Sequence, residues 1–118
     1  MILRDYQGQR LLEGAPGQPL IRTEDDVRAI LEDCFGKDVD RLLLYPENLT
    51  EGFFDLSSGE AGAILQKLRN YRIRLAVVRT PKMRLSHRFN EMMAEENRGP
   101  YFRIFDELQS ARDWLSSL

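Results

Sequence analysis

The sequence predicts an α/β protein in which helices pack on a mixed, mainly parallel β-sheet, in the order ββαβαβαβα. Leu42-Leu43-Leu44 and residues 75–78 (LAVV), which lie in an expected strand over residues 73–78 (IRLAVV), are short, continuous apolar runs. Such runs are typical of strands buried on both faces. Amphipathic stretches with capping residues at their starts precede and follow these runs, as the helices between parallel strands do. Such crossovers are right-handed, and residues 73–78 are expected to lie centrally in the sheet.

The N-terminal segment predicts a β-hairpin that adds an antiparallel portion to the sheet. Residues 2–12 contain two short apolar-polar stretches around Gln7-Gly8-Gln9, with Gly8 expected in the turn. Residues 14–17 (GAPG) form a loop, and Leu20-Ile21 are expected to add a short strand or extended segment.

The first helix is expected to begin at Thr23. Asp26 lies three residues later, which fits a capping box, and acidic residues favour this positive end of a helix. Gly36 is expected to mark the end of the helix. The apolar residues of one face form its core stripe: Val27, Ile30, Leu31 and Cys34.

The middle of the chain contains a buried strand and a connecting segment. Residues 41–45 form the strand, and Pro46 ends it. Residues 47–54 are expected to cross irregularly to the next helix, with Phe53 and Phe54 inserted into the core.

The second helix is expected to be capped by Ser57. Glu60 completes a Ser-x-x-Glu capping box, and Gly62 is small enough to let the helix lie close to the sheet. Its apolar residues form a buried stripe: Ala61, Ile64, Leu65, Leu68 and Tyr71.

The last third of the chain predicts a helix, a strand and a final helix. Residues 80–82 (TPK) break the preceding strand, and a helix marked by Leu85, Phe89, Met92 and Met93 ends at residues 99–100 (GP). Residues 101–105 form a strand. Asp106 is expected to cap the last helix, with Gln109 three residues on. The inward-facing residues of this helix are Leu108, Ala111, Trp114, Leu115 and Leu118.

The composition limits the classes of function. A length of 118 residues predicts a single domain over residues 1–118, and an apolar fraction of 42% is enough for a core without staples. Seventeen basic and nineteen acidic residues give a net charge of −2, which offers no electrostatic case for nucleic acid. No stretch has the length of a signal peptide's apolar region or a membrane span, so we expect a cytoplasmic protein without a membrane partner.

Catalytic and metal-binding signals are weak. His87 lies beside Arg84 and Arg88, which disfavour a charged imidazole, and Cys34 lies on a core stripe. The adjacent carboxylates Asp25-Asp26 and Glu95-Glu96 point about 100° apart on a helix and do not converge on an ion. We therefore expect no catalytic residue, no metal and no cofactor, and a protein that is not an enzyme.

Two features allow both a structural and a binding interpretation. Residues 57–59 (SSG) stand at a helix N-terminus, where they either cap the helix or hold an anion or phosphoryl group. A group of arginines lies around one helix end and the next strand. These arginines either stabilise the negative C-terminal end of the helix or form a patch that binds an acidic partner. The members of this group are Arg69, Arg72, Arg74 and Arg79.

Most of the chain, from the hairpin to the last helix, resembles a known family, and the middle block is the specific part of the likeness. The chain is similar to a bacterial STAS-like family, domain of unknown function 4180, at residues 53–56 (FFDL), Gly59, residues 61–62 (AG) and residues 64–67 (ILQK). The same holds for residues 70–71 (NY), 74–76 (RLA) and 96–99 (ENRG). More distantly, the order of strand, Ser-Ser-Gly turn, helix and buried strand resembles STAS domains of anti-sigma-factor antagonists. Where those domains carry an aspartate before the phosphorylated serine, this chain has Leu56.

The resemblance implies a STAS-like domain and a non-enzymatic protein-binding or regulatory module. Its partner, another protein, would dock on a surface that includes Ser57, Ser58, Gly59, Glu60, Asn97 and Arg98. The alternative is a small-molecule sensor or enzyme with a pocket at the C-terminal ends of the strands, where open α/β sheets bind ligands. Its residues would include Pro46, Glu47, Thr80 and Asp106.

Overall fold

The computed structural model describes residues 1–55, 58–79, 85–96 and 99–117, and it shows an α/β protein. The strands are β1 (Ile2–Tyr6), β2 (Gln9–Glu13), β3 (Arg41–Leu44), β4 (Arg74–Val78) and β5 (Phe102–Phe105). The helices are α1 (Glu24–Lys37), α2 (Glu51–Phe54), α3 (Glu60–Asn70), α4 (His87–Glu96) and α5 (Leu108–Ser116).

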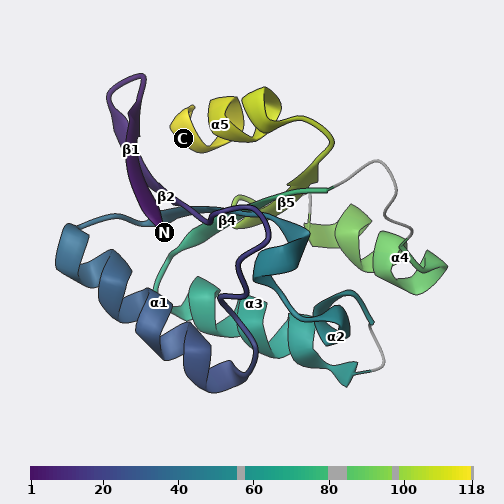
Figure 1. The fold of residues 1–118 in the computed structure, drawn as a ribbon. Helices are drawn as coiled ribbons and strands as arrows, with labels where there is room; N and C mark the ends of the chain where they lie inside the picture. The colour runs from purple at the N-terminus through teal and green to yellow at the C-terminus, as the bar shows by residue number, and fades with distance from the viewer. Residues whose placement is uncertain (56–57, 80–84, 97–98, 118) are drawn as a thin grey trace.

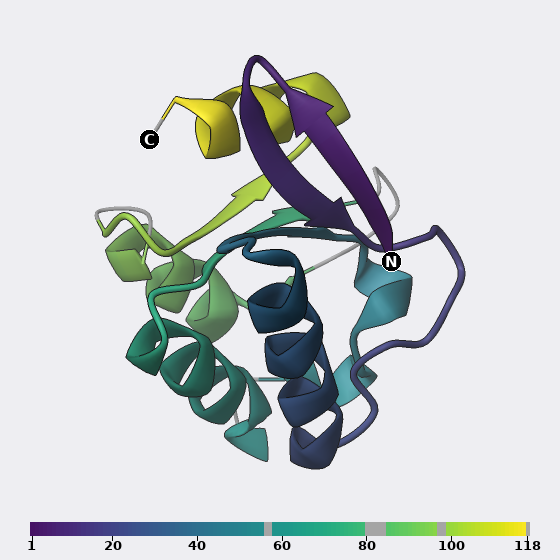
Figure 2. The same cartoon turned by 90° about the vertical axis from the view of Figure 1, so that its left-hand side faces the viewer.

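The five strands form one mixed sheet in the order β1-β2-β3-β4-β5. β1 pairs antiparallel with β2, and the other neighbours are parallel, as a mainly parallel sheet with an N-terminal hairpin predicts. β4 is an internal strand between β3 and β5. Figures 1 and 2 show α1 to α4 below the sheet and α5 above it. A sheet whose strands follow in sequence order receives its right-handed crossover helices on one face.

Each face of the sheet has its own apolar core. On the face of α1, α3 and α4, side chains such as Leu42, Leu75 and Phe102 pack with the buried stripes of the helices. On the face of α5, Leu43 and Ala76 pack against residues of α5, including Trp114.

The hairpin turn has the conformation expected from its sequence. Gln7 and Gly8 both have positive φ, at 52° and 81°, which is the geometry of a two-residue type I′ turn. The expected strand at Leu20-Ile21 is absent from the structure. Both backbone N–H groups donate instead to the carbonyl of Asn48, at 3.1 and 2.8 Å.

The segment between β3 and α3 is more regular than predicted. Residues Pro46–Asn48 form a 3₁₀ turn, and α2 follows in the stretch expected to be irregular. The order therefore contains two short elements beyond those predicted. Phe53 is fully buried and contacts the rings of Phe89 and Phe102, so its place in the core is confirmed.

The ends of α1 confirm one capping prediction and correct another. The Asp26 carboxylate accepts hydrogen bonds from the N–H groups of Arg22 (2.7 Å) and Thr23 (3.2 Å), and the Arg22 bond lowers the pKa of Asp26. Gly36 lies inside the helix. The left-handed residue that ends it is Asp38, with φ 55°, because a short polar side chain tolerates this conformation.

Three other side-chain predictions are wrong. Tyr71 is 54% exposed and packs edge-on against exposed Phe35. Gly62 faces solvent, with no atom near the position of a Cβ, so it does not bring α3 closer to the sheet. Glu107, rather than Asp106, is the residue before α5, because Asp106 pairs with Arg79. Leu118 lies outside the described residues.

We expect Val77→Asp to unfold the protein. Val77 is fully buried in β4, and an unpaired carboxylate there costs several kcal/mol of a total stability of about 5–15 kcal/mol. Leu3→Asp is the matched control, because Leu3 is 42% exposed on the edge strand β1. Thermal unfolding followed by circular dichroism measures both, and a cooperative Val77→Asp variant with the parental Tm would contradict this account of β4.

Candidate functional site

The turn before α3 contains the described part of the predicted binding surface. Ser58 and Gly59 are exposed, and Gly59 precedes the helix with a left-handed φ of 74°. The Ser58 hydroxyl lies 2.5 Å from the carbonyl of Gly52 and 2.8 Å from that of Asp55, and it accepts the N–H of Glu60 at 3.1 Å. Gly59 therefore occupies the cap position that was predicted for Ser57, which lies outside the described residues.

The Glu60 side chain turns inward from this surface. Its carboxylate accepts the hydroxyl hydrogen of Thr50 at 2.6 Å, so it bonds to the start of α2 rather than to a capping residue of its own helix. A Cβ at Gly52 would lie 2.2 Å from Glu60 Oε2, so the carboxylate rests directly on the backbone of α2. Because Thr50 Oγ1 also accepts the N–H of Phe53 at 3.2 Å, these contacts fix α2 against α3.

A small hollow adjoins the turn where the N-terminal ends of α1, α2 and α3 meet. Its volume is about 200 Å³, and its apolar lining is Ile21 and Ile64. Arg22, Thr23, Thr50 and Glu60 supply the polar lining. We call Ser58, Gly59, Glu60 and this hollow the turn surface. Asn97 and Arg98, which were predicted to belong with it, lie outside the described residues.

A second hollow lies at the C-terminal ends of β4 and β5, where the alternative hypothesis expects a ligand. Its volume is about 260 Å³, and its lining includes Arg79, Asn90 and Asp106. Arg79 Nε lies 2.8 Å from the Asp106 carboxylate. Of the four residues named for this site, Asp106 lines the hollow, Thr80 is outside the described residues, and Pro46 and Glu47 belong to the 3₁₀ turn.

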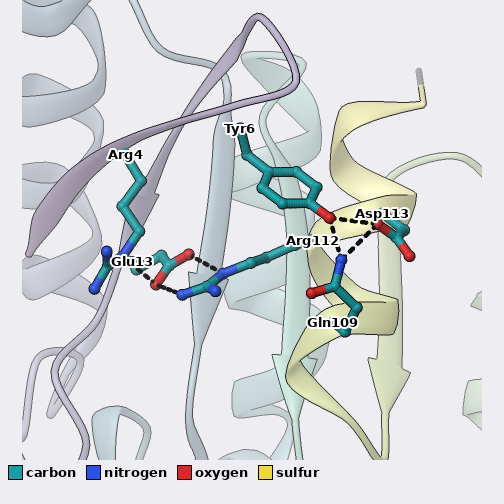
Figure 3. A network of polar contacts seen from close by, with 6 residues as sticks. All are labelled: Arg4, Tyr6, Glu13, Gln109, Arg112 and Asp113. Atoms are coloured by element: carbon teal, nitrogen blue, oxygen red, sulfur yellow. Dashed lines mark hydrogen bonds and ion pairs between the residues drawn. The ribbon is translucent and has the colours of Figure 1, made fainter.

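A buried carboxylate that the sequence pattern did not predict lies on the α5 face of the sheet (Figure 3). Glu13 ends β2 and is 3% exposed. Arg112 of α5 donates two hydrogen bonds to it, at 2.8 and 2.9 Å, and Arg4 of β1 donates a third at 2.8 Å. These bonds raise the pKa of Arg112, because they favour its charged form. The sequence carries one signal for this site, which is a charged residue, Glu13, at a strand position where a buried side chain is expected.

A second polar group extends the contact between the hairpin and α5. The Tyr6 hydroxyl donates to the Asp113 carboxylate at 2.8 Å and accepts from the Gln109 amide (Figure 3). The bond to Asp113 raises the pKa of Tyr6, because the phenol must remain protonated to donate it. These two groups act as a polar clamp that joins β1 and β2 to α5.

The residues considered for catalysis lie on different helices. Cys34 is fully buried on α1, and burial raises the pKa of its thiol to about 11. His87 is exposed on α4 and lies 3.0 Å from Glu91. Among the described residues, no three His, Cys, Asp or Glu side chains are grouped to hold a metal ion, and no helix is long and apolar enough to cross a membrane.

Residues 6–115 match a known protein family, described as Domain of unknown function (DUF4180). The chain belongs to this family. The match covers the sheet from the end of β1 to β5 and nearly all of α5. No curated protein and no solved structure matches the chain. The function of the family is unknown, so membership assigns no activity to the chain.

Loss of the Glu13 carboxylate should destabilise the protein more than loss of one of its partners. In Glu13→Ala, the Arg112 guanidinium, which is 22% exposed, loses its carboxylate, and we expect a cost of about 3 kcal/mol. Arg4→Ala should cost under about 1 kcal/mol, because Arg4 is 47% exposed. Urea denaturation measures the free energy of unfolding of both variants. Equal decreases in the two variants would contradict a polar clamp centred on Glu13.

The Cys34 thiol should make stability fall at high pH. Its pKa rises from 9.0 in an open chain to about 11 in the folded protein, so the unfolded state loses its proton first. Stability linked to this thiol is therefore complete below pH 9 and decreases as the pH rises toward 11. The free energy of unfolding of the wild type should decline more steeply over this range than that of Cys34→Ala. Parallel curves would show that the thiol is not desolvated.

Proposed function

We propose that this member of the family is a STAS-like, non-enzymatic module of the bacterial cytoplasm that binds another protein through the turn surface. Regulation of that partner by reversible docking is the proposed role. The observation that carries the proposal is that Ser58 and Gly59 are exposed while internal hydrogen bonds hold the side chains of Ser58 and Glu60.

The fixed geometry of the turn supports docking. Ser58 and Gly59 face solvent, whereas the Ser58 hydroxyl and the Glu60 carboxylate bond to the protein itself. Binding to Ser58 and Gly59 costs little conformational entropy, because the bonds of Ser58 are formed before a partner binds. The adjoining hollow, with Ile21 and Ile64 in its lining, offers space for one small side chain of the partner.

The arrangement around the turn supports a STAS-like relationship. A turn, the amphipathic helix α3 and the buried strand β4 follow one another, as in the family that the sequence resembles. Phosphorylation of Ser58 is less well supported than docking. Its hydroxyl takes part in internal hydrogen bonds, and the neighbouring Glu60 would repel a phosphate.

The proposal that the protein is not an enzyme rests on the two residues best suited to nucleophilic or acid-base chemistry. The raised pKa of the buried Cys34 thiol opposes formation of a thiolate, which is the reactive form. His87 is exposed and pairs with Glu91 of the same helix, and it lines neither hollow.

A small-molecule sensor or enzyme is the alternative function, and the hollow beside Arg79 and Asp106 favours it. The apolar part of its lining includes Leu85, Met93 and Ile104, which suits a ligand with both a polar and an apolar part. The Arg79–Asp106 ion pair would have to open or accept that ligand.

Ser58→Trp should abolish co-purification of the protein partner while the fold survives. The indole covers the turn surface, and Ser58 is exposed, so the core is undisturbed. Ser110→Trp is the matched control, because Ser110 is exposed on α5 across the sheet. Affinity purification from the native host, followed by mass spectrometry, measures the partner.

Three results would contradict the proposed function. Binding that persists in Ser58→Trp would leave the turn as a helix cap alone. Stoichiometric phosphate on Ser57 or Ser58 in protein from growing cells would favour a phosphorylation switch instead. An enzymatic activity of the purified protein that is lost in Asp106→Ala, while partner binding is unchanged, would support the alternative function at the second hollow.

A further inference from the structure

Three arginines share the α5 face of the sheet, near the N-terminal ends of the parallel strands. Arg41 opens β3 and Arg74 opens β4, and the two are direct partners in the register. Arg103 lies on β5 opposite Ala76, two residues farther along the same face. Their side chains share the face of Leu43 and Ala76, which pack with α5, because alternate residues of a strand point to the same side.

This arrangement places like charges close together. Neighbouring strands are about 4.8 Å apart, and like charges on adjacent strands destabilise a sheet. Arg41 has partners, because it donates to the Gln9 amide oxygen and lies 3.6 Å from Asp40. Among the residues that the structure describes, no carboxylate lies within 4 Å of Arg74 or Arg103.

Two of the guanidinium groups also bury a nitrogen without an acceptor. Arg74 Nη1 and Arg103 Nε are inaccessible to solvent and have no hydrogen-bond partner in the described part of the chain. The Arg103 guanidinium is held over the Trp114 ring, 5.3 Å from its centre, so its position is fixed by α5. A buried charged donor without an acceptor is costly, and an anion would remove that cost.

We propose that Arg41, Arg74 and Arg103 form a binding site for a doubly charged phosphate-type oxyanion. The guanidinium fork matches the oxygens of phosphate, and the two charges of Arg74 and Arg103 that lack a carboxylate match a dianion. Both side chains are half-buried, so a ligand can approach the guanidinium groups from solvent although Arg74 Nη1 and Arg103 Nε themselves are covered, and water competes weakly there. The site lies across the sheet from the turn surface and is independent of protein docking there.

The test follows the side-chain Nε–H signals of the arginines by NMR while inorganic phosphate is added at pH 8 and constant ionic strength. We expect saturable shifts for Arg74 and Arg103. Arg112 serves as the internal reference, because Glu13 already occupies its guanidinium. Shifts that do not saturate, or that sodium chloride reproduces, would overturn the proposal, because they would reflect general screening.

Matched variants assign the binding to these residues. Arg74→Gln and Arg103→Gln should each weaken phosphate binding at least about tenfold, since a charged hydrogen bond is lost. Arg28→Gln removes the same charge from the exposed surface of α1 and should leave the affinity unchanged. Arg74→Lys keeps the charge but loses the fork, so its affinity should be intermediate. Equal affinity in all four variants would overturn the site.

The source of the phosphate group is decided by a second titration with a phosphate monoester, phenyl phosphate. Tighter binding of the ester than of inorganic phosphate would indicate a phosphorylated organic ligand, and equal binding would indicate the free ion. Both results support a phosphate-type site. Acetate that binds as tightly as phosphate would contradict the preference for a dianion.

Discussion

The structure depends on the burial of both faces of one sheet. Leu42, Leu43 and Leu44 of β3 are all completely buried, although successive side chains of a strand point to opposite faces. Each face must therefore carry its own cover. The sequential strand order sends α1, α3 and α4 to one face, and the C-terminal helix α5 must cover the other.

A single helix is too narrow for this second face. A helix is about 10 Å wide, whereas five strands at about 4.8 Å spacing span roughly 20 Å. Apolar residues, such as Leu43 and Ala76, therefore lie beneath α5, and polar residues flank it. Glu13 satisfies the arginines on the hairpin side, whereas Arg74 and Arg103 keep buried nitrogens without acceptors. The proposed anion site follows from this difference between the hairpin side and the arginines of β4 and β5.

The helix-rich face places the turn surface at one end of α3. The bond between Glu60 and Thr50 ties α2 to α3, and Ser58 closes the turn between them. Because these bonds are internal, Ser58 is held in place without a partner. This is the physical basis of the proposed docking role, and the family, whose function is unknown, neither adds to it nor opposes it.

Local sequence determined the parts of this protein that depend on local chemistry. The hairpin turn at Gln7-Gly8, the start of α1 at Thr23 and the buried runs of β3 and β4 follow from turn, capping and hydrophobic preferences. The exposure of Ser58 and the burial of Cys34 also follow from their positions on a turn and on an apolar stripe.

Only the tertiary structure decided which distant side chains meet. Glu60 bonds to Thr50, and Asp106 pairs with Arg79 instead of capping α5, because the fold brings these partners together. The contact of Glu13 with Arg112 joins residues 99 positions apart, and the row of Arg41, Arg74 and Arg103 exists only through strand register. Local patterns carry no information on such pairings, because they arise from strand order and the packing of α5.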